Sequence, residues 1–410
     1  MATQKLRFKE FNDNWLKVDI QSLVDEKNID KPMDGNHGEI HPTSADYVED
    51  GIPFVMATDV IDGKVYLDKS KKIKKSQADG LRKGFSLEGD ILLTHKATIG
   101  NVAKVPELET PYIMLTPQVT YYRVLNKDKL NQDFIKSTFE APVFQNALLA
   151  LCTGATRLYI GISEQRKLPF SYPSKKEQSK IASFLSTVDE KISQLTQKHA
   201  LLSQYKQGMM QKLFSQEIRF KADDGSEFGE WEEKKLGEIS KTFSGGTPQS
   251  SNKSFYEGTI PFIKSGEISK NTTEQCINDL ALEKSSAKLV KKGDLLYALY
   301  GATSGQVAIS QIDGAINQAV LCIRSELNTK YLLNFLLLKK EEILTTYLQG
   351  GQGNLSASIL KEIYIPTPCL KEQTKIANFL SAIDQKIEVV AQQIEQAKQW
   401  KKGLLQQMFV

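Results

Sequence analysis

Residues 175–214 read KKEQSKIASFLSTVDEKISQLTQKHALLSQYKQGMMQKLF, and residues 370–409 read LKEQTKIANFLSAIDQKIEVVAQQIEQAKQWKKGLLQQMF. Aligned at a constant offset of 195 and without a gap, the two segments are identical at 18 of 40 positions. Agreement of this kind does not arise from shared helical composition alone, so the chain contains an internal duplication. The duplication predicts two half-molecules, each a globular region followed by a long helix.

Apolar residues within each copy recur at alternating spacings of four and three, which is the pattern of a coiled-coil seam. A single amphipathic helix on a globular core would show a wider apolar stripe and would tend to end sooner. Lys206 and Lys401 interrupt both seams at the same position, where we expect the helices to splay or to meet another chain. The expected seam residues are Ile181, Leu185, Val188, Ile192, Leu195, Ile376, Leu380, Ile383, Ile387 and Val390.

The connection between the two helices favours an antiparallel pair. Each helix would be about 58 Å long at 1.5 Å per residue, and in a parallel pair the roughly 20 linker residues could only just span that length if taut. An antiparallel pair instead separates two globular domains by the length of the coiled coil and relates them by a pseudo-two-fold axis. Arg7 and Trp15 then correspond to Arg219 and Trp231. The N-terminus should lie beside residues 403–409, which makes the chain nearly circular.

The globular regions also correspond, with loops of different lengths. PFV at 53–55 matches PFI at 261–263, and GDIL at 89–92 matches GDLL at 293–296. Patterns of short strands and amphipathic helices predict an α+β class. We expect strands at 52–60, 89–94 and 113–124, and helices at 131–152 and 329–348. The predicted domains are 1–174, the helix 175–215, a linker with the second domain at 216–369, and the helix 370–410.

Composition narrows the class of protein. The 410 residues carry a net charge of only +4, with 40% hydrophobic and 25% charged residues, as in an ordinary globular chain. Four scattered cysteines without a C-x-x-C pair indicate reduced thiols, and no apolar run is long enough to cross a membrane. We therefore expect a cytoplasmic protein without membrane contact. Residues 222–233 hold six acidic and no basic side chains, which is typical of a solvated linker.

Motifs for catalysis are missing from the sequence. There is no Walker G-x-x-x-x-G-K-[ST] and no Asn- or Asp-Pro-Pro-aromatic stretch. His37 and His41 frame a glutamate, but it stands one place late for a zinc H-E-x-x-H, and Gly38 and Pro42 oppose the required helix. We expect no metal site and no catalytic residues.

Polar, glycine-rich loops recur at matching places in the two halves: 34–42 with 244–249, 95–101 with 300–306, and 153–157 with 349–354. Glycine lets the backbone approach a surface closely, and Asn, Gln, Arg, His and Thr can read base edges. Residues 64–83 add eight basic against two acidic side chains, which suits phosphate contact. The expected DNA contacts are Asn36, His37, His41, Lys72, Lys74, Lys96, Thr98, Thr156, Arg157, Thr247, Gln249, Tyr300, Thr303, Gln352 and Asn354.

Two diverged globular domains, each followed by a K-E-Q-x-K-I-A-x-F-L-S-x-x-D-x-K-I helix, resemble the specificity subunit of a type I restriction–modification system. The resemblance covers essentially the whole chain, and the duplicated helix is its most specific part. It implies two target recognition domains that each read one half of a bipartite, asymmetric site in double-stranded DNA. It further implies that the paired helices set the half-site spacing and dock two modification (methyltransferase) subunits, which restriction subunits then join.

The resemblance also implies that the chain binds no cofactor of its own. S-adenosylmethionine, ATP and Mg²⁺ would belong to the partner subunits. Two other classes of protein stay open at this point: a self-contained DNA methyltransferase or nuclease with duplicated DNA-binding domains, and a coiled-coil adaptor without a nucleic-acid role.

Overall fold

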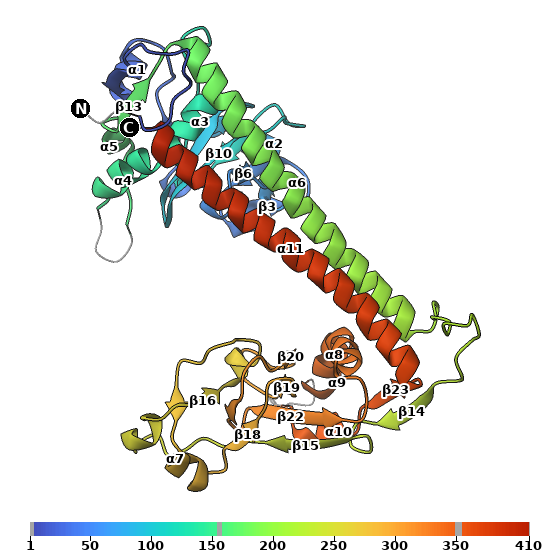
Figure 1. The fold of residues 1–410 in the computed structure, drawn as a ribbon. Helices are drawn as coiled ribbons and strands as arrows, with labels where there is room; N and C mark the ends of the chain where they lie inside the picture. The colour runs from blue at the N-terminus through green and yellow to red at the C-terminus, as the bar shows by residue number, and fades with distance from the viewer. Residues whose placement is uncertain (1–3, 154–157, 349–354, 410) are drawn as a thin grey trace. The chain divides into compact units, whose positions relative to one another are not determined.

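The computed structural model describes residues 4–153, 158–348 and 355–409 (Figure 1). The chain divides into two compact units, and each unit takes in part of both long helices. Unit 1 comprises residues 1–195 and 392–410, and unit 2 comprises residues 196–391. The domain boundaries drawn from the sequence run at the helix ends instead, and they stay a prediction. Helices and sheets share a core in each unit, so the expected α+β class is confirmed.

Unit 1 contains a four-stranded sheet in the order β10-β9-β12-β2 and a five-stranded sheet in the order β3-β7-β4-β11-β8. Small two-stranded sheets join β1 to β13 and β5 to β6. The strands are β1 (Leu16–Asp19), β2 (Met33–Asp34), β3 (Tyr47–Val48), β4 (Ile52–Val55), β5 (Val60–Ile61), β6 (Lys64–Val65), β7 (Lys71–Ile73), β8 (Phe85–Ser86), β9 (Ile91–Lys96), β10 (Thr98–Lys104), β11 (Ile113–Leu115), β12 (Val119–Tyr122) and β13 (Pro169–Tyr172). The shorter helices are α1 (Ile20–Asp25), α2 (Lys75–Asp79), α3 (Gln132–Glu140), α4 (Pro142–Ala150) and α5 (Ile162–Gln165).

Unit 2 repeats this plan with sheets in the orders β15-β22-β19-β20 and β17-β16-β21-β18, and with β14 paired to β23. The parallel pair β4–β11 of unit 1 returns as the parallel pair β16–β21. The strands are β14 (Glu232–Lys235), β15 (Ser240–Ser244), β16 (Ile260–Ile263), β17 (Cys276–Ile277), β18 (Lys288–Val290), β19 (Leu295–Ala298), β20 (Val307–Ile309), β21 (Gly314–Ile316), β22 (Val320–Ser325) and β23 (Tyr364–Thr367). The shorter helices are α7 (Asp279–Glu283), α8 (Thr329–Leu338), α9 (Lys340–Leu348) and α10 (Ala357–Lys361).

The repeated G-D-[IL]-L segment opens the central strand of each unit. Alternate side chains of a strand point to opposite faces, so Ile91 and Leu93 of β9 enter one core while Leu92 enters another. The aspartate before the strand, Asp90, accepts the guanidinium of Arg123 at 2.8 Å. Asp294 of unit 2 receives Arg324 in the same way at 2.6 Å. The motif is therefore a structural device for anchoring the strand.

Three expected elements are interrupted, in one case for a clear reason. The helix expected at 131–152 ends at Glu140 and restarts at Pro142 as α4, because proline has no N–H to donate within a continuing helix. The strand expected at 113–124 is two strands, β11 and β12, around Thr116 and Pro117. The helix expected at 329–348 is likewise divided into α8 and α9.

The duplicated segments form α6 (Lys175–Phe214) and α11 (Leu370–Met408). In unit 1, Phe184 of α6 meets Trp400 of α11 with ring centroids 6.1 Å apart, and Asp189 pairs with Lys401 at 2.7 Å. In unit 2, Lys206 pairs with Asp384 at 2.7 Å. From Asp189 to Lys206 the numbers rise along α6, while those of their partners fall from Lys401 to Asp384 along α11, which confirms the antiparallel pair.

The two seam-breaking lysines correct one expectation. Lys206 and Lys401 do not mark a splayed end, because each forms an ion pair with the aspartate at the matching repeat position on the facing helix. Lys401 also reaches Glu140 of α3 at 2.6 Å. The lysines thus hold the register of the helix pair.

The seam itself is broader than a coiled coil requires. Eight of the ten expected residues are buried, and Ile192 and Ile387 are half-buried. Ile181, Leu185 and Val188 belong to the hydrophobic core of unit 1, together with residues of its sheet and of α3. Ile376, Leu380 and Ile383 do the same in unit 2. The stripe therefore packs on a globular core as well as on the other helix, which a seam dedicated to helix pairing would not do.

The repeated Glu–Gln pair at the start of each long helix organises its unit. Glu177 is buried and accepts the Arg7 guanidinium at 2.8 Å and the Trp15 indole N–H at 3.3 Å. The neighbouring Gln178 accepts the N–H of Asn131, the N-cap of α3, at 3.0 Å. In this way one motif fastens the N-terminal segment and α3 to the long helix.

Unit 2 repeats both contacts. Glu372 accepts Arg219 at 2.9 Å and the Trp231 indole at 2.9 Å, and Gln373 accepts the N–H of Asn328 at 2.9 Å. The expected correspondence of Arg7 and Trp15 with these residues is confirmed. Because Trp231 is half-buried and β14 begins at Glu232, the end of the 222–233 segment is ordered structure rather than a solvated linker.

The chain termini meet within unit 1. The N–H groups of Lys5 and Leu6 donate to the carbonyl of Gln407 at 3.0 and 3.1 Å. The Trp15 and Phe409 rings lie 5.9 Å apart, edge to face. The expected closure of the N-terminus onto the end of the second long helix is confirmed.

Candidate nucleic-acid interface

Two loops of unit 1 that were matched by sequence, 34–42 and 95–101, lie beside the stretch that follows residue 157. His95, at the end of β9, exchanges contacts with Ile160: the Ile160 N–H donates to the His95 carbonyl at 3.1 Å, and His95 Nδ1 lies 2.9 Å from the Ile160 carbonyl. Lys96 forms a bridge with Tyr159. Asp34 Oδ2 lies 4.0 Å from His95 Nε2. Loops from 34–42, 95–101 and the stretch after 157 therefore form one surface.

Thr156 and Arg157 lie outside the described residues. Their flanks are anchored, because Thr153 and Tyr159 exchange two backbone hydrogen bonds of 2.9 Å each. The bond from the Ile160 N–H to the His95 carbonyl recurs in unit 2, where the N–H of Leu355 donates to the Leu299 carbonyl at 3.1 Å. Gln352 and Asn354, in the loop before Leu355, also lie outside the described residues.

A buried carboxylate organises the 34–42 loop. Asp34 Oδ2 accepts His37 Nε2 at 2.9 Å, and Oδ1 accepts the Lys83 ammonium. Burial alone would raise the pKa of Asp34, but the hydrogen bonds from Lys83 and His37 lower it below its ordinary value. The ionised carboxylate therefore orients His37, which is exposed and able to contact a ligand.

His95 is held neutral beside this carboxylate. Burial lowers the pKa of His95 below its ordinary value, despite the hydrogen bond to Ile160 and the charge of Asp34. Because a carbonyl only accepts, Nδ1 carries the ring proton and donates to Ile160. His95 thus connects the 95–101 loop to the stretch after residue 157 through its hydrogen bonds with Ile160.

One expected DNA contact lies in the interior. Asn36 is 2% exposed, donates from Nδ2 to the Lys83 carbonyl at 2.6 Å, and accepts the Arg82 N–H at 3.1 Å. Its amide holds the loop, so we remove Asn36 from the candidate interface. His41 is half-buried, with its ring centroid 5.5 Å from that of Phe54, and it stays a candidate through its partly exposed atoms.

The basic segment at 64–83 is less available than its charge count suggests. Lys64 donates to Ser193 of α6 at 2.8 Å, Lys75 pairs with Asp79 at 2.6 Å, and Lys83 is occupied by Asp34. Lys72 is half-buried, 3.9 Å from Asp50. Lys74 stays exposed at the N-terminus of α2.

The β9–β10 hairpin carries two further exposed candidates. Lys96 and Thr98 flank Ala97, whose φ of 68° lies in the left-handed region and shapes the tight turn. Together with His37 they offer cationic and hydroxyl groups on the surface formed by the three loops. Such groups suit contact with phosphates and base edges.

Unit 2 holds a hollow of about 370 Å³ at the corresponding loop 244–249. Thr247 lies in its wall and bonds Gln318, while the Tyr256 hydroxyl fixes the loop by donating to the Pro248 carbonyl at 2.7 Å. Gln249 is exposed beside it. The lining residues are Thr247, Ser250, Lys253, Tyr256, Phe262, Lys264, Gln275 and Asn317.

The chemistry of this hollow suits a nucleotide. Two lysines can meet phosphate, the amides of Gln275 and Asn317 can pair with base edges, and Tyr256 offers an aromatic face. Sequence reasoning missed Lys253, Lys264, Gln275 and Asn317. A usable signal existed only for Lys264, which directly follows the repeated P-F-[IV] strand.

The third loop of unit 2 contributes less. Tyr300 is half-buried and packs against the hydrophobic core, and Thr303 is half-buried as well. Both stay candidates through their partly exposed atoms. Among the described residues, no group of three His, Cys, Asp or Glu side chains could hold a metal ion. No described helix is long and apolar enough to cross a membrane.

Comparison with known proteins identifies relatives of the whole chain. A family model described as the type I restriction modification DNA specificity domain matches residues 34–204 and 229–399. These two matches are offset by 195 residues, the same offset as the helix duplication. The putative type I restriction enzyme MjaX specificity subunit of Methanocaldococcus jannaschii is 26% identical over 369 residues, covering 87% of this chain and 85% of that protein. The MjaVIII specificity subunit of the same organism is 28% identical, covering 77% and 74%.

Solved structures agree on the fold. The type I restriction–modification S subunit from M. genitalium aligns over 100% of this chain and 99% of its own, with a TM-score of 0.57 and 18% identity. A second chain, from a study of complex assembly and conformational transition in the type I system, aligns over 96% and 97% with a TM-score of 0.59 and 18% identity. The arrangement of duplicated helices and paired globular units is therefore shared with these proteins.

Proposed function

Because this chain belongs to the type I restriction–modification DNA specificity family, we propose that it reads a bipartite, asymmetric site in double-stranded DNA and performs no catalysis itself. Unit 1 reads one half-site through the surface that includes His37, Lys96 and Thr98. Unit 2 reads the other through the hollow beside Thr247.

One observation carries this proposal: loops of different sequence sit at equivalent places on a repeated framework. The Glu–Gln motif, the helix N-cap asparagines and the Asp–Arg pair make the same contacts in both units. The polar loops of the two units differ at most of their side chains, although Ala97-Thr98 and Ala302-Thr303 are shared. A shared scaffold with divergent polar loops is the arrangement that two independent half-sites require.

The partners follow from the same family membership. Two modification subunits dock on the chain and methylate the DNA that it selects, and restriction subunits join through them. S-adenosylmethionine, ATP and Mg²⁺ belong to those partners. A net charge of only +4 supports this division of labour, because partner subunits then supply much of the contact with the phosphate backbone.

Exchange of one recognition domain tests the proposal. Residues 1–174 are replaced with the equivalent block of a related chain, and methylated sites are mapped across the genome of cells that carry the hybrid with its modification subunit. We expect one half-site to change while the other half-site and the spacer stay the same. A change in both half-sites would contradict independent reading by the two units.

A binding measurement separates this function from its alternatives. The chain is titrated into labelled duplex DNA with and without the modification subunit, in the presence of S-adenosylmethionine. Methylation by the chain alone would indicate a self-contained enzyme. Failure to bind duplex DNA in either condition would indicate an adaptor without a nucleic-acid role.

A further inference from the structure

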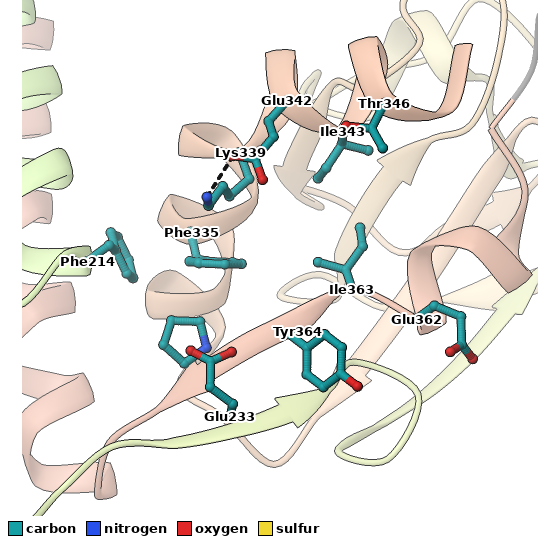
Figure 2. A pocket seen from close by; sticks show the side chains of 11 residues that line it. Phe214, Glu233, Phe335, Lys339, Glu342, Ile343, Thr346, Glu362, Ile363 and Tyr364 are labelled. Carbon is teal, nitrogen blue, oxygen red and sulfur yellow. Dashed lines mark hydrogen bonds and ion pairs between the residues drawn. The ribbon is translucent and has the colours of Figure 1, made fainter. Parts of the chain in front are cut away.

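A second hollow of unit 2 has a chemistry unlike that of the first. It encloses about 400 Å³ between the end of α6, the helices α8 and α9, and the strands β14 and β23. Phe214, Phe335 and Ile363 form an apolar floor, and Glu233, Glu342 and Glu362 stand around it. Figure 2 shows Phe335 of α8 and Lys339, the residue after this helix, across the acidic groove from Ile363 and Tyr364.

The rim keeps an excess of negative charge. Lys339 pairs with Glu342 at 2.7 Å, and Lys235 pairs with Glu362 at 2.7 Å. Within the described part of the chain, Glu233 forms no ion pair. Carboxylates repel phosphates, so the acidic groove does not suit DNA. The hollow at Thr247, with Lys253 and Lys264, has the opposite charge.

The equivalent place in unit 1 is closed. Phe409 occupies the repeat position of Phe214, and it packs against Trp15 at 5.9 Å and against Phe134 at 5.6 Å between ring centroids. Only about 30 Å³ stays open there, and no charged side chain lines it. The duplication thus placed equivalent sites in the two units, and of these two only the site in unit 2 is open and acidic.

We propose that the acidic groove docks one modification subunit through a segment in which an apolar side chain is followed by Lys or Arg. An apolar floor ringed by charge is the anatomy of a protein–protein contact, with an anchoring side chain below and complementary charges at the rim. A basic segment supplies that complementarity, and rim charges of this kind steer association. The inference rests on the proposed function, which supplies the partner.

Because unit 1 lacks the groove, the two modification subunits meet different surfaces. One engages unit 2 with this anchor, and the other engages unit 1 without it. The chain therefore distinguishes the two positions even though its framework is symmetric in design.

Charge reversal at the rim tests the proposal with the full chain. Glu233→Lys and Glu342→Lys are combined, since both side chains are exposed. A matched control combines Glu107→Lys with Glu109→Lys, two exposed residues beyond the end of β10 that lies away from the Lys96 hairpin. A third variant, Thr346→Trp, fills the groove from an exposed position and leaves its charges unchanged.

Binding of the purified modification subunit is measured by calorimetric titration, and complex mass by light scattering. We expect the rim variant and Thr346→Trp to weaken one of two binding events at least about tenfold while the other persists. The control should match the wild-type chain. Equal affinities of all variants for the modification subunit, or equal weakening of both binding events, would overturn the proposal that the groove docks one subunit.

A parallel measurement keeps the two proposals apart. Wild-type chain and rim variant are titrated with a duplex of mixed sequence at the same salt concentration. Unchanged or stronger DNA binding by the rim variant, beside the loss of one binding event, supports docking at the groove. If the wild-type chain bound neither the duplex nor the modification subunit, both the proposed function and the proposed docking at the groove would be overturned.

Discussion

Replacement of Lys401 by methionine should destabilise unit 1 far more than the same change at Lys206 destabilises unit 2. Lys401 stands between Asp189 of α6 at 2.7 Å and Glu140 of α3 at 2.6 Å. Lys136 of α3 contacts the same two carboxylates at 2.9 and 2.7 Å. Two cations and two anions thus alternate in a network that joins α3, α6 and α11.

The magnitude follows from burial. Side chains of Lys401, Lys136 and Glu140 are only 12–15% exposed, so Lys401→Met leaves two poorly hydrated carboxylates on one remaining cation. Breaking a buried ion pair costs about 3–5 kcal/mol. Because Asp189 is 35% exposed and keeps Lys136, solvent screening reduces the expected loss to about 2–3 kcal/mol. For a unit of about 200 residues this lowers Tm by about 4–12 °C.

Lys206 is the matched control because it occupies the same repeat position. Among the described residues it pairs with Asp384 alone, which is 49% exposed, and the places of Lys136 and Glu140 on the neighbouring helix are taken by Leu333 and Leu337. The Lys206 side chain is only 15% exposed, like that of Lys401, but its one partner is half-exposed and stays hydrated when the pair is broken, so the pair contributes at most about 1 kcal/mol. Scanning calorimetry of the full chain measures both variants, and Glu140→Gln added to Lys401→Met should restore part of the loss. Equal destabilisation by Lys401→Met and Lys206→Met would refute the reasoning.

The same network predicts a pH dependence. Burial alone would raise the pKa of Asp189, but the charges of Lys136 and Lys401 lower it below the ordinary value. A carboxyl with a lowered folded-state pKa contributes stability above the unfolded value of about 3.9, and that stability is lost as the pH falls through the folded value. The stability difference between wild type and Lys401→Met should therefore shrink below about pH 4.

Four further predictions concern other parts of the chain. Glu372→Gln should lower the free energy of unfolding by about 1.5–3 kcal/mol, because the buried carboxylate holds both Arg219 and Trp231; urea titration measures the loss, and Glu177→Gln should behave alike. Since burial lowers the pKa of His95, its contribution to stability should be lost as the pH falls below about 6.5, and His95→Asn should remove that slope from melting temperatures recorded between pH 5.5 and 7.5. Arg157→Ala should cost about 1–3 kcal/mol of DNA binding and relax one base position, whereas Lys74→Ala should weaken binding to all sequences and reduce its salt dependence. Joining the termini, which meet at Gln407, and reopening the chain between Asp224 and Gly225 should preserve the circular dichroism spectrum and the melting temperature; a molten product would contradict the closure.

The sequence alone determined the architecture because duplication and helical periodicity are local patterns. An identity of 18 in 40 positions at one offset predicts two equivalent half-molecules, and the length of the helices against the linker favours an antiparallel pair. From this symmetry the correspondence of Arg7 and Trp15 with Arg219 and Trp231 could be predicted without coordinates. The loops that form the candidate interface in unit 1 were also found this way, because they recur at matching positions.

Which side chains of those loops face outward was decided only by the tertiary structure. The side-chain amide of Asn36 has the donor and acceptor groups that can read a base. In the structure it is hydrogen-bonded to backbone groups of residues 82 and 83, far along the chain. In the sequence, Lys206 and Lys401 interrupt the apolar pattern of the seam. In the structure, each lysine lies 2.7 Å from an aspartate of the facing helix. The acidic groove likewise joins Phe214 of α6 to residues of α9 and β23 that lie more than a hundred positions further along the chain. Burial and pairing at such separations depend on how the elements pack, and no local pattern of residues encodes that packing.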